Sequence, residues 1–258
     1  MTGMVLAGVE KNGLVAWQFA KLAAFEGLCH GVFGRRGGVS TGPFASLNVA
    51  FSCGDVPENV VRNRTRVARW TGLQKAVYLN QVHGDTVQVL TRETVAGGLT
   101  TVKADAVVTD ARQQLLVIQV ADCQAVMLFD PVRRVIANVH SGWRGSVRNI
   151  LGKTVDIMVR RFGCRADDLR AAIGPSLGPC CAEFVHYRRE LPRPFWPYQD
   201  HRHRFDFWAI SCDQLTAAGL RPDFIVHSGI CTRCRSEEFY SYRASHRTGR
   251  FAVVIGLK

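Results

Sequence analysis

The sequence lacks a long hydrophobic run, and no apolar stretch approaches the roughly 18 residues that a membrane-spanning helix needs. It also lacks the features of a secretory leader, because Lys21 and Glu26 interrupt the apolar stretch near the N-terminus and no small-residue cleavage site stands out. No Pro/Ser-rich linker divides the 258 residues, which can bury a core as one large domain or as two fused halves. These absences predict a cytoplasmic protein without a membrane partner.

Nucleotide-binding loops are missing as well, since the chain has no GxxxxGK motif followed by Ser or Thr and no GxGxxG that opens a helix after a strand. The formal charge of +12 suggests nucleic acid or a phosphorylated small molecule as a partner. However, the first sixty residues are neutral, the excess is spread over the rest, and there is no basic tail. A non-enzymatic nucleic-acid binder is therefore a hypothesis from charge alone, and we do not expect nucleic acid as a partner.

Nine cysteines in a chain without an export signal are not expected to form disulfides. Four are scattered and are interpreted as small buried hydrophobes: Cys29, Cys53, Cys164 and Cys212. The adjacent pair Cys180-Cys181 and the CxxC at residues 231–234 could together build a structural zinc site. Adjacent cysteines rarely supply two ligands to one tetrahedral metal, however, and no second CxxC exists. By default, these four residues are interpreted as structural or incidental.

Hydrophobic periodicity predicts three main helices, over residues 57–71, 146–162 and 206–218, with Asp55 as a plausible cap of the first. Strands are expected over residues 76–82, 86–91, 104–109, 115–120, 125–129, 134–140, 169–173, 239–242 and 251–255. Residues 191–204 are expected to form a surface loop or lid. Because strands and helices mix without strict βα alternation, the pattern predicts an α+β fold, with a mixed or antiparallel sheet covered by helices.

His83, Cys123 and His140 are the strongest candidates for chemistry. Each follows an apolar run that is predicted to be a strand, so the three side chains could converge at one rim of a sheet. Two imidazoles and one thiolate are the ligand set of a catalytic zinc site, with the fourth position left for water or substrate. A Cys and a His at strand ends could equally serve as a nucleophile and its base. Spacing alone leaves both hypotheses open, together with unrelated structural roles.

Asp122 and Arg144 flank these candidates. In a regular strand, the side chain of Asp122 would point to the opposite side from that of Cys123. Unless the strand has ended, Asp122 could then influence the site only through other residues. Arg144 lies in a Gly-flanked turn before a predicted helix, and both guanidinium groups and helix N-termini favour anions. Arg144 is therefore a candidate phosphate ligand, with an ion pair to Asp122 or Asp105 as the alternative.

A series of motifs in a fixed order runs through nearly the whole chain. They are HGVFGRRGGVSTGP at residues 30–43, SLN at 46–48, GD at 54–55, NR at 63–64, QVHG at 81–84, ADA at 104–106, ADC at 121–123, HSGWRG at 140–145, AIGP at 172–175, CT at 231–232, SYR at 241–243 and TGRF at 248–251. In these motifs the chain resembles the YfiH-like family, which is also called the laccase-domain, multicopper polyphenol oxidase or peptidoglycan-editing-factor family.

The resemblance implies a fold, a metal and catalytic residues. The fold is a single domain over residues 1–258, with a mixed sheet covered by helices, related to cytotoxic-necrotizing-factor-like cysteine hydrolases. The metal is zinc, held by His83, Cys123 and His140, and catalytic roles are expected for Cys123, His140 and Asp122. We expect a monomer or a small homo-oligomer. The chain departs from the family's pattern at Ser141, which replaces Ala, and at residues 182–185, where AEFV stands in place of Tyr-Glu-Val.

The resemblance also implies purine nucleoside chemistry, namely phosphorolysis of adenosine, inosine and methylthioadenosine, and deamination of adenosine. Small-molecule nucleosides and phosphate are then the partners, with Arg35, Arg36, Asn48 and Arg144 as candidate substrate-binding residues. The family has also been assigned copper-dependent phenol oxidation (laccase activity) and an amidase that edits a peptidoglycan precursor, by zinc or by a Cys/His pair. Multicopper oxidation needs many His ligands in paired HxH motifs, whereas this chain has eight His and one HxH, at residues 201–203. Copper is therefore not expected as the cofactor.

Overall fold

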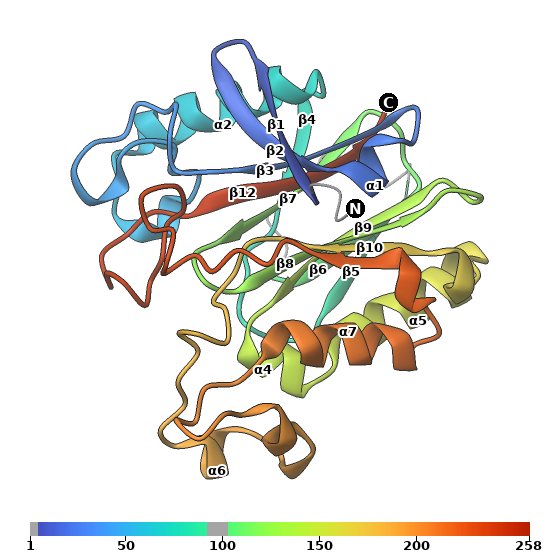
Figure 1. The fold of residues 1–258 in the computed structure, drawn as a ribbon. Coiled ribbons are helices and arrows are strands. Elements are labelled where there is room, and N and C mark those ends of the chain that lie inside the picture. Colours follow the sequence, from blue (N-terminus) through green and yellow to red (C-terminus); the bar gives the residue numbers. More distant parts are fainter. Residues whose placement is uncertain (1–4, 92–102) are drawn as a thin grey trace.

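The structure is a computed structural model that describes residues 5–91 and 103–258, and its centre consists of two six-stranded sheets (Figure 1). In spatial order, the first sheet contains β1 (Leu6–Lys11), β2 (Leu14–Phe19), β3 (Leu28–Phe33), β12 (Phe251–Leu257), β7 (Gln114–Val120) and β4 (Lys75–Tyr78). The second contains β11 (Ile225–His227), β10 (Arg170–Ile173), β8 (Gln124–Asp130), β9 (Val135–Ser141), β6 (Ala106–Thr109) and β5 (Val87–Leu90).

Both sheets are mixed. Most neighbouring strands are antiparallel, whereas β4–β7, β5–β6 and β10–β11 are parallel pairs. The predicted α+β class is thus confirmed, but the expectation of one mixed sheet is wrong, because the strands divide between two. The reason is visible in the core, where Val253 of the first sheet and Met127 and Ile136 of the second belong to one buried cluster. Each sheet buries one face against the other.

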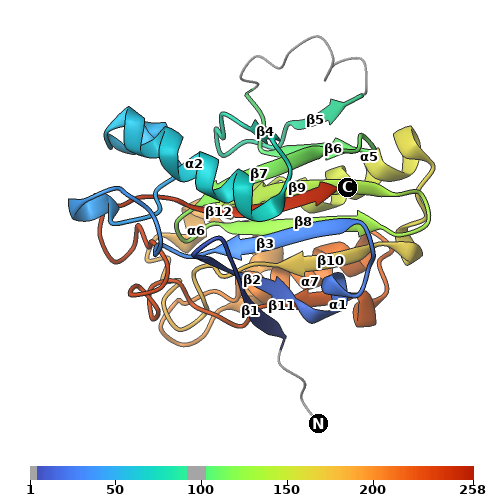
Figure 2. The same cartoon turned by 90° about the horizontal axis from the view of Figure 1, so that it is seen from above.

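Helices cover the two outer faces. The helix α2 (Pro57–Thr71) packs Val67 and Trp70 against the first sheet. Figure 2 shows α2 beside this sheet, whose strands can be traced from β1 to β4. The helices α5 (Ile150–Phe162) and α7 (Phe207–Ala217) cover the second sheet, with Leu151, Val155 and Leu215 in its outer core. Among the residues that the structure describes, the short helices are α1 (Ala20–Ala23), α4 (Trp143–Val147) and α6 (Tyr187–Glu190). The layers are therefore helix, sheet, sheet, helix.

The first predicted helix has the expected bounds, but Asp55 does not cap it. The N-cap position is occupied by Val56, whose side chain accepts no hydrogen bond, while Oδ1 of Asp55 accepts from the adjacent N–H of Val56 at 2.8 Å. Instead, Oδ2 of Asp55 accepts hydrogen bonds from Ser40 Oγ at 2.6 Å and from Asn48 Nδ2 at 2.9 Å. Asp55 therefore holds the preceding loops together, a tertiary role that the local sequence pattern does not reveal.

The predicted helix over residues 146–162 is divided in two. The break comes at Asn149, which has a φ of +53° and whose side chain accepts a hydrogen bond from the N–H of Gly152, so that it caps α5. Residues 206–218 form the expected helix α7, with Asp206 as its N-cap.

Two other segments differ from expectation. Residues 239–242 form a bend and an irregular segment instead of a strand, and Phe239 and Tyr240 are buried in the core between the sheets. The region around residues 191–204, predicted to be a surface loop or lid, includes a 3-10 helix over Arg193–Tyr198 and packs Leu191 and Phe195 into a small aromatic cluster with Tyr187. In the described part of the chain, no helix has the length and hydropathy needed to cross a bilayer.

Candidate metal centre where the chain crosses between the sheets

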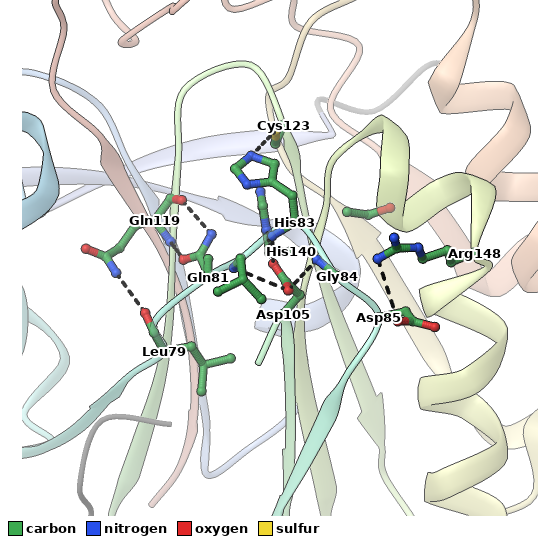
Figure 3. Close-up of polar contacts among 12 residues, drawn as sticks. Leu79, Gln81, His83, Gly84, Asp85, Asp105, Gln119, Cys123, His140 and Arg148 are labelled. Atoms are coloured by element: carbon green, nitrogen blue, oxygen red, sulfur yellow. Dashed lines mark hydrogen bonds and ion pairs between the residues drawn. The ribbon is translucent and has the colours of Figure 1, made fainter. Parts of the chain in front are cut away.

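The site lies where the chain passes from one sheet to the other. His83 belongs to residues 79–86, which connect β4 of the first sheet to β5 of the second. Cys123 belongs to residues 121–123, which connect β7 of the first sheet to β8 of the second, and His140 is the penultimate residue of β9. Figure 3 shows these three side chains converging from their separate strand ends. The predicted strand over residues 76–82 is short because this crossing begins after Tyr78.

The three side chains are close enough to share one ion. Their ligand atoms all lie within 4.8 Å of one another, and Sγ of Cys123 is 3.9 Å from Nε2 of His83. The two imidazole rings are nearly perpendicular, at 82°, with centroids 4.8 Å apart. Zinc bonds of about 2.0–2.3 Å would place tetrahedral ligand atoms roughly 3.3–3.6 Å apart. The donor set fits zinc after small side-chain adjustments, and the exposed His83 leaves one side open to solvent.

Asp105, just before β6, orients the buried His140. Oδ1 of its fully buried carboxylate is 2.8 Å from Nδ1 of His140, which leaves Nε2 of that ring free to face Cys123 and His83. A carboxylate that fixes the tautomer of a ligating imidazole is a common partner in zinc sites. Burial opposes ionisation of Asp105, but hydrogen bonds from His140 and from the backbone of Gly84 and His83 outweigh it and lower the pKa of this carboxyl.

The same carboxylate organises the loop that carries His83. The N–H of His83 donates to Oδ1 of Asp105 at 2.9 Å, and the N–H groups of Gly84 and Val82 donate to Oδ2 at 2.7 and 3.4 Å (Figure 3). Successive N–H groups around one anion compensate the strained left-handed φ of +58° at His83. Because Asp105 binds the ring of His140 and the backbone of His83, it preorganises two of the three ligands.

A second contact holds this loop to the first sheet. Gln81 Nε2 donates to the carbonyl of Gln119 at 2.9 Å, and the N–H of Gln119 donates back to Oε1 of Gln81 at the same distance (Figure 3). Beyond the end of β4, the side chain of Gln81 thus makes the hydrogen bonds to β7 that a neighbouring strand would make. These bonds fix the point at which the chain leaves the first sheet.

The Cys123 thiol and the His140 imidazole influence each other strongly. Burial opposes ionisation of Cys123, but the charge and hydrogen bonds of His140 and His83 outweigh it and lower the pKa of the thiol to about 6. Burial likewise disfavours protonation of His140, but the charges and hydrogen bonds of Cys123 and Asp105 raise the pKa of this imidazole to about 9. A thiolate beside an imidazole can bind a soft or borderline metal, and it is also a nucleophile.

Gly142 closes one side of the cluster. A Cβ at this position would lie 3.1 Å from Sγ of Cys123 and 3.2 Å from Cδ2 of His83, although the backbone φ of −75° would accept any residue. The glycine is therefore required by the space that the ligands occupy, not by the local conformation.

Asp122, a predicted catalytic residue, points away from the cluster. The strand has ended by this residue, whose φ is +84°, and its carboxylate accepts hydrogen bonds at 2.6 Å from Thr232 Oγ1 and from the N–H of Arg243. Asp122 thus anchors the segment around residues 232–243 beside Cys123, and both oxygens of its carboxylate have partners.

The predicted phosphate ligands fall into two groups. Asn48 is fully buried, and all four hydrogen-bonding positions of its amide are used, by Ala50, Asp55 and the backbone N–H of Arg250. Arg35 is half-buried and donates to the carbonyls of Ala45 and Ser236. These two side chains hold loops together and have little capacity left for an anion.

Arg36 and Arg144 are both exposed. Arg36 has one hydrogen bond, from Nε to the carbonyl of Glu237 at 3.2 Å, and Arg144 stacks on Trp143 at 4.4 Å. Among the described residues, no ion pair joins Arg144 to Asp122 or Asp105, so the alternative that the sequence left open does not occur. The guanidinium groups of Arg36 and Arg144 are exposed and can be reached by a ligand.

Comparison with known proteins identifies the family. Residues 29–258 match the family model described as multi-copper polyphenol oxidoreductase laccase. The chain belongs to this laccase-domain family. The chain is 33% identical to "Purine nucleoside phosphorylase YlmD" of Geobacillus stearothermophilus over 257 residues, which cover 93% of this chain and 94% of that protein. It is 32% identical to "Purine nucleoside phosphorylase YfiH" of Escherichia coli over a region that covers 86% of this chain and 91% of that protein.

Solved structures of this laccase-domain family share the fold. The structure of YlmD from Geobacillus stearothermophilus superposes with a TM-score of 0.87 at 31% identity, and covers 98% of this chain and 99% of that one. The structure of YfiH from Bacillus licheniformis superposes with a TM-score of 0.86 at 28% identity, and covers 97% and 99%. The resemblance expected from the motifs is confirmed. The further likeness to cytotoxic-necrotizing-factor-like hydrolases stays a prediction.

Sequence reasoning missed the roles of Asp105 and Gly142. The sequence pattern suggests an ion pair with Arg144 for Asp105, although an acidic residue between two alanines and before a buried strand signals a paired, functional carboxylate. Gly142 lies two positions after the predicted ligand His140 in the sequence. The three-dimensional structure is needed to show that the absence of a side chain at Gly142 makes room for the cluster.

Proposed function

We propose that this protein is a zinc-dependent enzyme that acts on purine nucleosides, by phosphorolysis of adenosine, inosine and methylthioadenosine and by deamination of adenosine. The observation that carries the proposal is the convergence of His83, Cys123 and His140 around one point. The names of the relatives support a purine nucleoside as substrate and phosphate as co-substrate. Zinc and deamination rest on the donor set alone.

Each residue of the site has a defined task in this proposal. His83, Cys123 and His140 hold the zinc ion, which when bound supplies a Lewis acid beside the substrate. Asp105 keeps the proton of His140 on Nδ1, so that Nε2 stays available. The exposed side of His83 admits the nucleoside. Asp122 positions the segment around residues 232–243 and does not contact the reacting atoms.

Phosphate is assigned to the two exposed arginines. Arg144 follows the site glycine Gly142 by two positions, and Arg36 lies on the loop that contacts Glu237. Guanidinium groups bind phosphate oxygens in pairs, so both can serve an anionic co-substrate. Arg144→Ala and Arg36→Ala should each raise the KM for phosphate and leave the zinc content unchanged.

The test combines metal analysis with activity. Cys123→Ala should lose one equivalent of zinc relative to the parent protein, together with both phosphorolysis and deamination. Full activity of a metal-free preparation would exclude the proposal. Asp105→Asn should lower zinc affinity by about 10- to 100-fold. A matched control is Asp85→Asn, because Asp85 lies in the same loop as His83 and forms surface ion pairs with Arg148 and Lys153.

A second candidate is a cysteine amidase that acts on a cell-wall precursor. The arrangement of Asp105, His140 and Cys123 favours this candidate. The three residues combine an orienting carboxylate, an imidazole and a thiol of lowered pKa. Here amide hydrolysis in zinc-free protein should disappear in step with alkylation of Cys123. Retention of amidase activity after complete alkylation of that thiol would remove this candidate.

A further inference from the structure

Four cysteines outside the site form a second cluster. The sulfur atoms of Cys180, Cys181, Cys231 and Cys234 all lie within 4.8 Å of one another. Sγ of Cys234 is 3.5 Å from that of Cys180 and 3.6 Å from that of Cys181. Zinc–sulfur bonds of about 2.3 Å place tetrahedral sulfur ligands roughly 3.8 Å apart. The four thiols therefore already have nearly the spacing of a tetrahedral thiolate site.

The fold brings the cysteines together from two loops. One loop follows β10 and the other lies between β11 and β12. The two run side by side at Ser176 and Cys231, and the N–H of Thr232 donates to the carbonyl of Ser176 at 3.0 Å. At Gly178 a Cβ would lie 3.0 Å from Cβ of Cys231 and 2.8 Å from the ring of Trp208. The loops thus approach as closely as a glycine allows.

A tight turn explains how adjacent cysteines can face the same point. The N–H groups of Cys181 and Ala182 both donate to the carbonyl of Gly178, at 2.9 and 3.0 Å. This turn removes the alternation that would send Cys180 and Cys181 to opposite sides of a strand. The local backbone therefore allows both members of the adjacent pair to face one point.

Positive charge lies close to the cluster. Arg204 Nη1 donates to the carbonyl of Cys180 at 3.1 Å, and Arg243 Nη1 donates to the carbonyl of Glu183 at 3.1 Å and contacts that of Cys181 at 3.5 Å. A Zn²⁺ ion with four thiolates carries a net charge of about −2. Two guanidinium groups held at the backbone of the ligands offset this charge.

We propose that Cys180, Cys181, Cys231 and Cys234 bind a structural zinc ion through four thiolates. A closed set of four sulfur ligands is typical of structural sites and leaves no position for a substrate. The ion would fasten the two loops to each other. Through the hydrogen bonds of Thr232 and Arg243 to Asp122, it also fixes the segment beside Cys123. This second site shares no residue with the first and does not depend on the proposed activity.

The decisive sample is the full-length variant that carries both His83→Ala and Cys123→Ser, purified in reducing buffer with zinc, because it removes the first cluster and keeps the second. We expect one zinc per chain by native mass spectrometry, against two in the parent. Zinc X-ray absorption should give four sulfur neighbours at about 2.3 Å and no lighter ligand. Adding Cys234→Ser should abolish zinc binding, whereas Cys212→Ser, a cysteine on α7 outside both clusters, should keep it.

Several results would overturn the proposal. The first is that the double variant takes up no zinc. The second is that its X-ray absorption spectra require nitrogen or oxygen neighbours. The third is that mass spectrometry shows a disulfide of Cys234 in the freshly purified chain. If the double variant does not fold, the parent decides. With both sites filled it should show an average of about 2.5 sulfur ligands per zinc, and an average near one would contradict the four-thiolate site.

Discussion

At the scale of single residues, Gly142 shows how little room the candidate centre leaves. Its backbone has φ −75° and ψ 173°, a conformation that alanine adopts without strain. The nearest atoms to a methyl group on this residue belong to the cluster itself, with Cys123 Sγ at 3.1 Å and His83 Cδ2 at 3.2 Å. A substitution here therefore separates the requirements of the site from those of the fold.

We expect Gly142→Ala to weaken zinc binding at the first site by about tenfold or more, a cost of roughly 1.4 kcal/mol. The change in the free energy of unfolding of the zinc-free protein should stay within about 1 kcal/mol, since the backbone tolerates alanine. Zinc competition titrations and urea unfolding of the apoprotein measure the two effects. Unchanged affinity, or a collapse of stability with affinity preserved, would contradict this account of Gly142.

At the scale of elements, the break between α4 and α5 depends on one residue. Asn149 has a left-handed φ of +53°, and its side chain accepts a hydrogen bond from the N–H of Gly152 at 3.1 Å. Asn is among the residues that enter this conformation most readily, and it is also a good N-cap. One side chain thus allows the sharp turn that leads from the site to the covering helix.

Substitutions at Asn149 should rank in a defined order. Asn149→Ala loses the cap and keeps the unfavourable φ, so we expect it to lower the free energy of unfolding by about 1–3 kcal/mol. Asn149→Gly loses the cap but relieves the φ, and should cost less. Asn149→Asp keeps the cap and should be nearly neutral. Thermal unfolding by circular dichroism measures the series, and an alanine variant as stable as the glycine variant would count against the left-handed cap.

The elements that the sequence predicted well are those with a strong period. The amphipathic α2 has the expected bounds, and the apolar runs that became β7, β8 and β9 are all strands. Periodicity could not reveal the break at Asn149, because one capping residue interrupts an apolar stripe that continues on both sides. Nor could it predict that residues 239–242 are irregular, since Phe239 and Tyr240 are apolar and buried although they lie outside the described strands.

The site was predictable in its ligand types but not in its supports. Soft donors at the ends of apolar runs marked His83, Cys123 and His140, and the structure brings them together. Asn48 could not be judged from sequence, because its amide is used up by loops far apart in the chain. The division into two sheets also has no local signal, since it depends on which strands pair across distances of many residues.

At the scale of the whole molecule, the core shared by the two sheets determines stability, and it contains a buried imidazole. His30 lies on β3 with the same strand parity as Val32, so it faces the core between the sheets. Its Nε2 accepts a hydrogen bond from the N–H of Phe19 at 2.9 Å. Burial lowers the pKa of His30 to about 4, against the opposing effect of the Phe19 backbone.

This imidazole should make the stability of the fold depend on pH. His30 is neutral in the folded chain down to about pH 4, whereas in the unfolded chain it takes up a proton near pH 6.5. The unfolded state therefore binds more protons in this window. As a result, the contribution of neutral His30 to the free energy of unfolding is fully present above about pH 6.5. This contribution falls by roughly 3 kcal/mol as the pH drops towards 4.

The contribution of His30 can be isolated by comparing variants. His30→Gln keeps an acceptor for the N–H of Phe19 but has no titrating group, so its stability should decline less between pH 6.5 and pH 4 than that of the parent, by roughly 3 kcal/mol. Val32→Ala, a buried neighbour on the same face of β3, should instead lower stability by a similar amount at every pH. Urea unfolding at several pH values measures both. Parallel stability curves for the parent and His30→Gln would show that His30 is protonated equally in both states, because only a difference in proton binding between folded and unfolded chains can produce the slope.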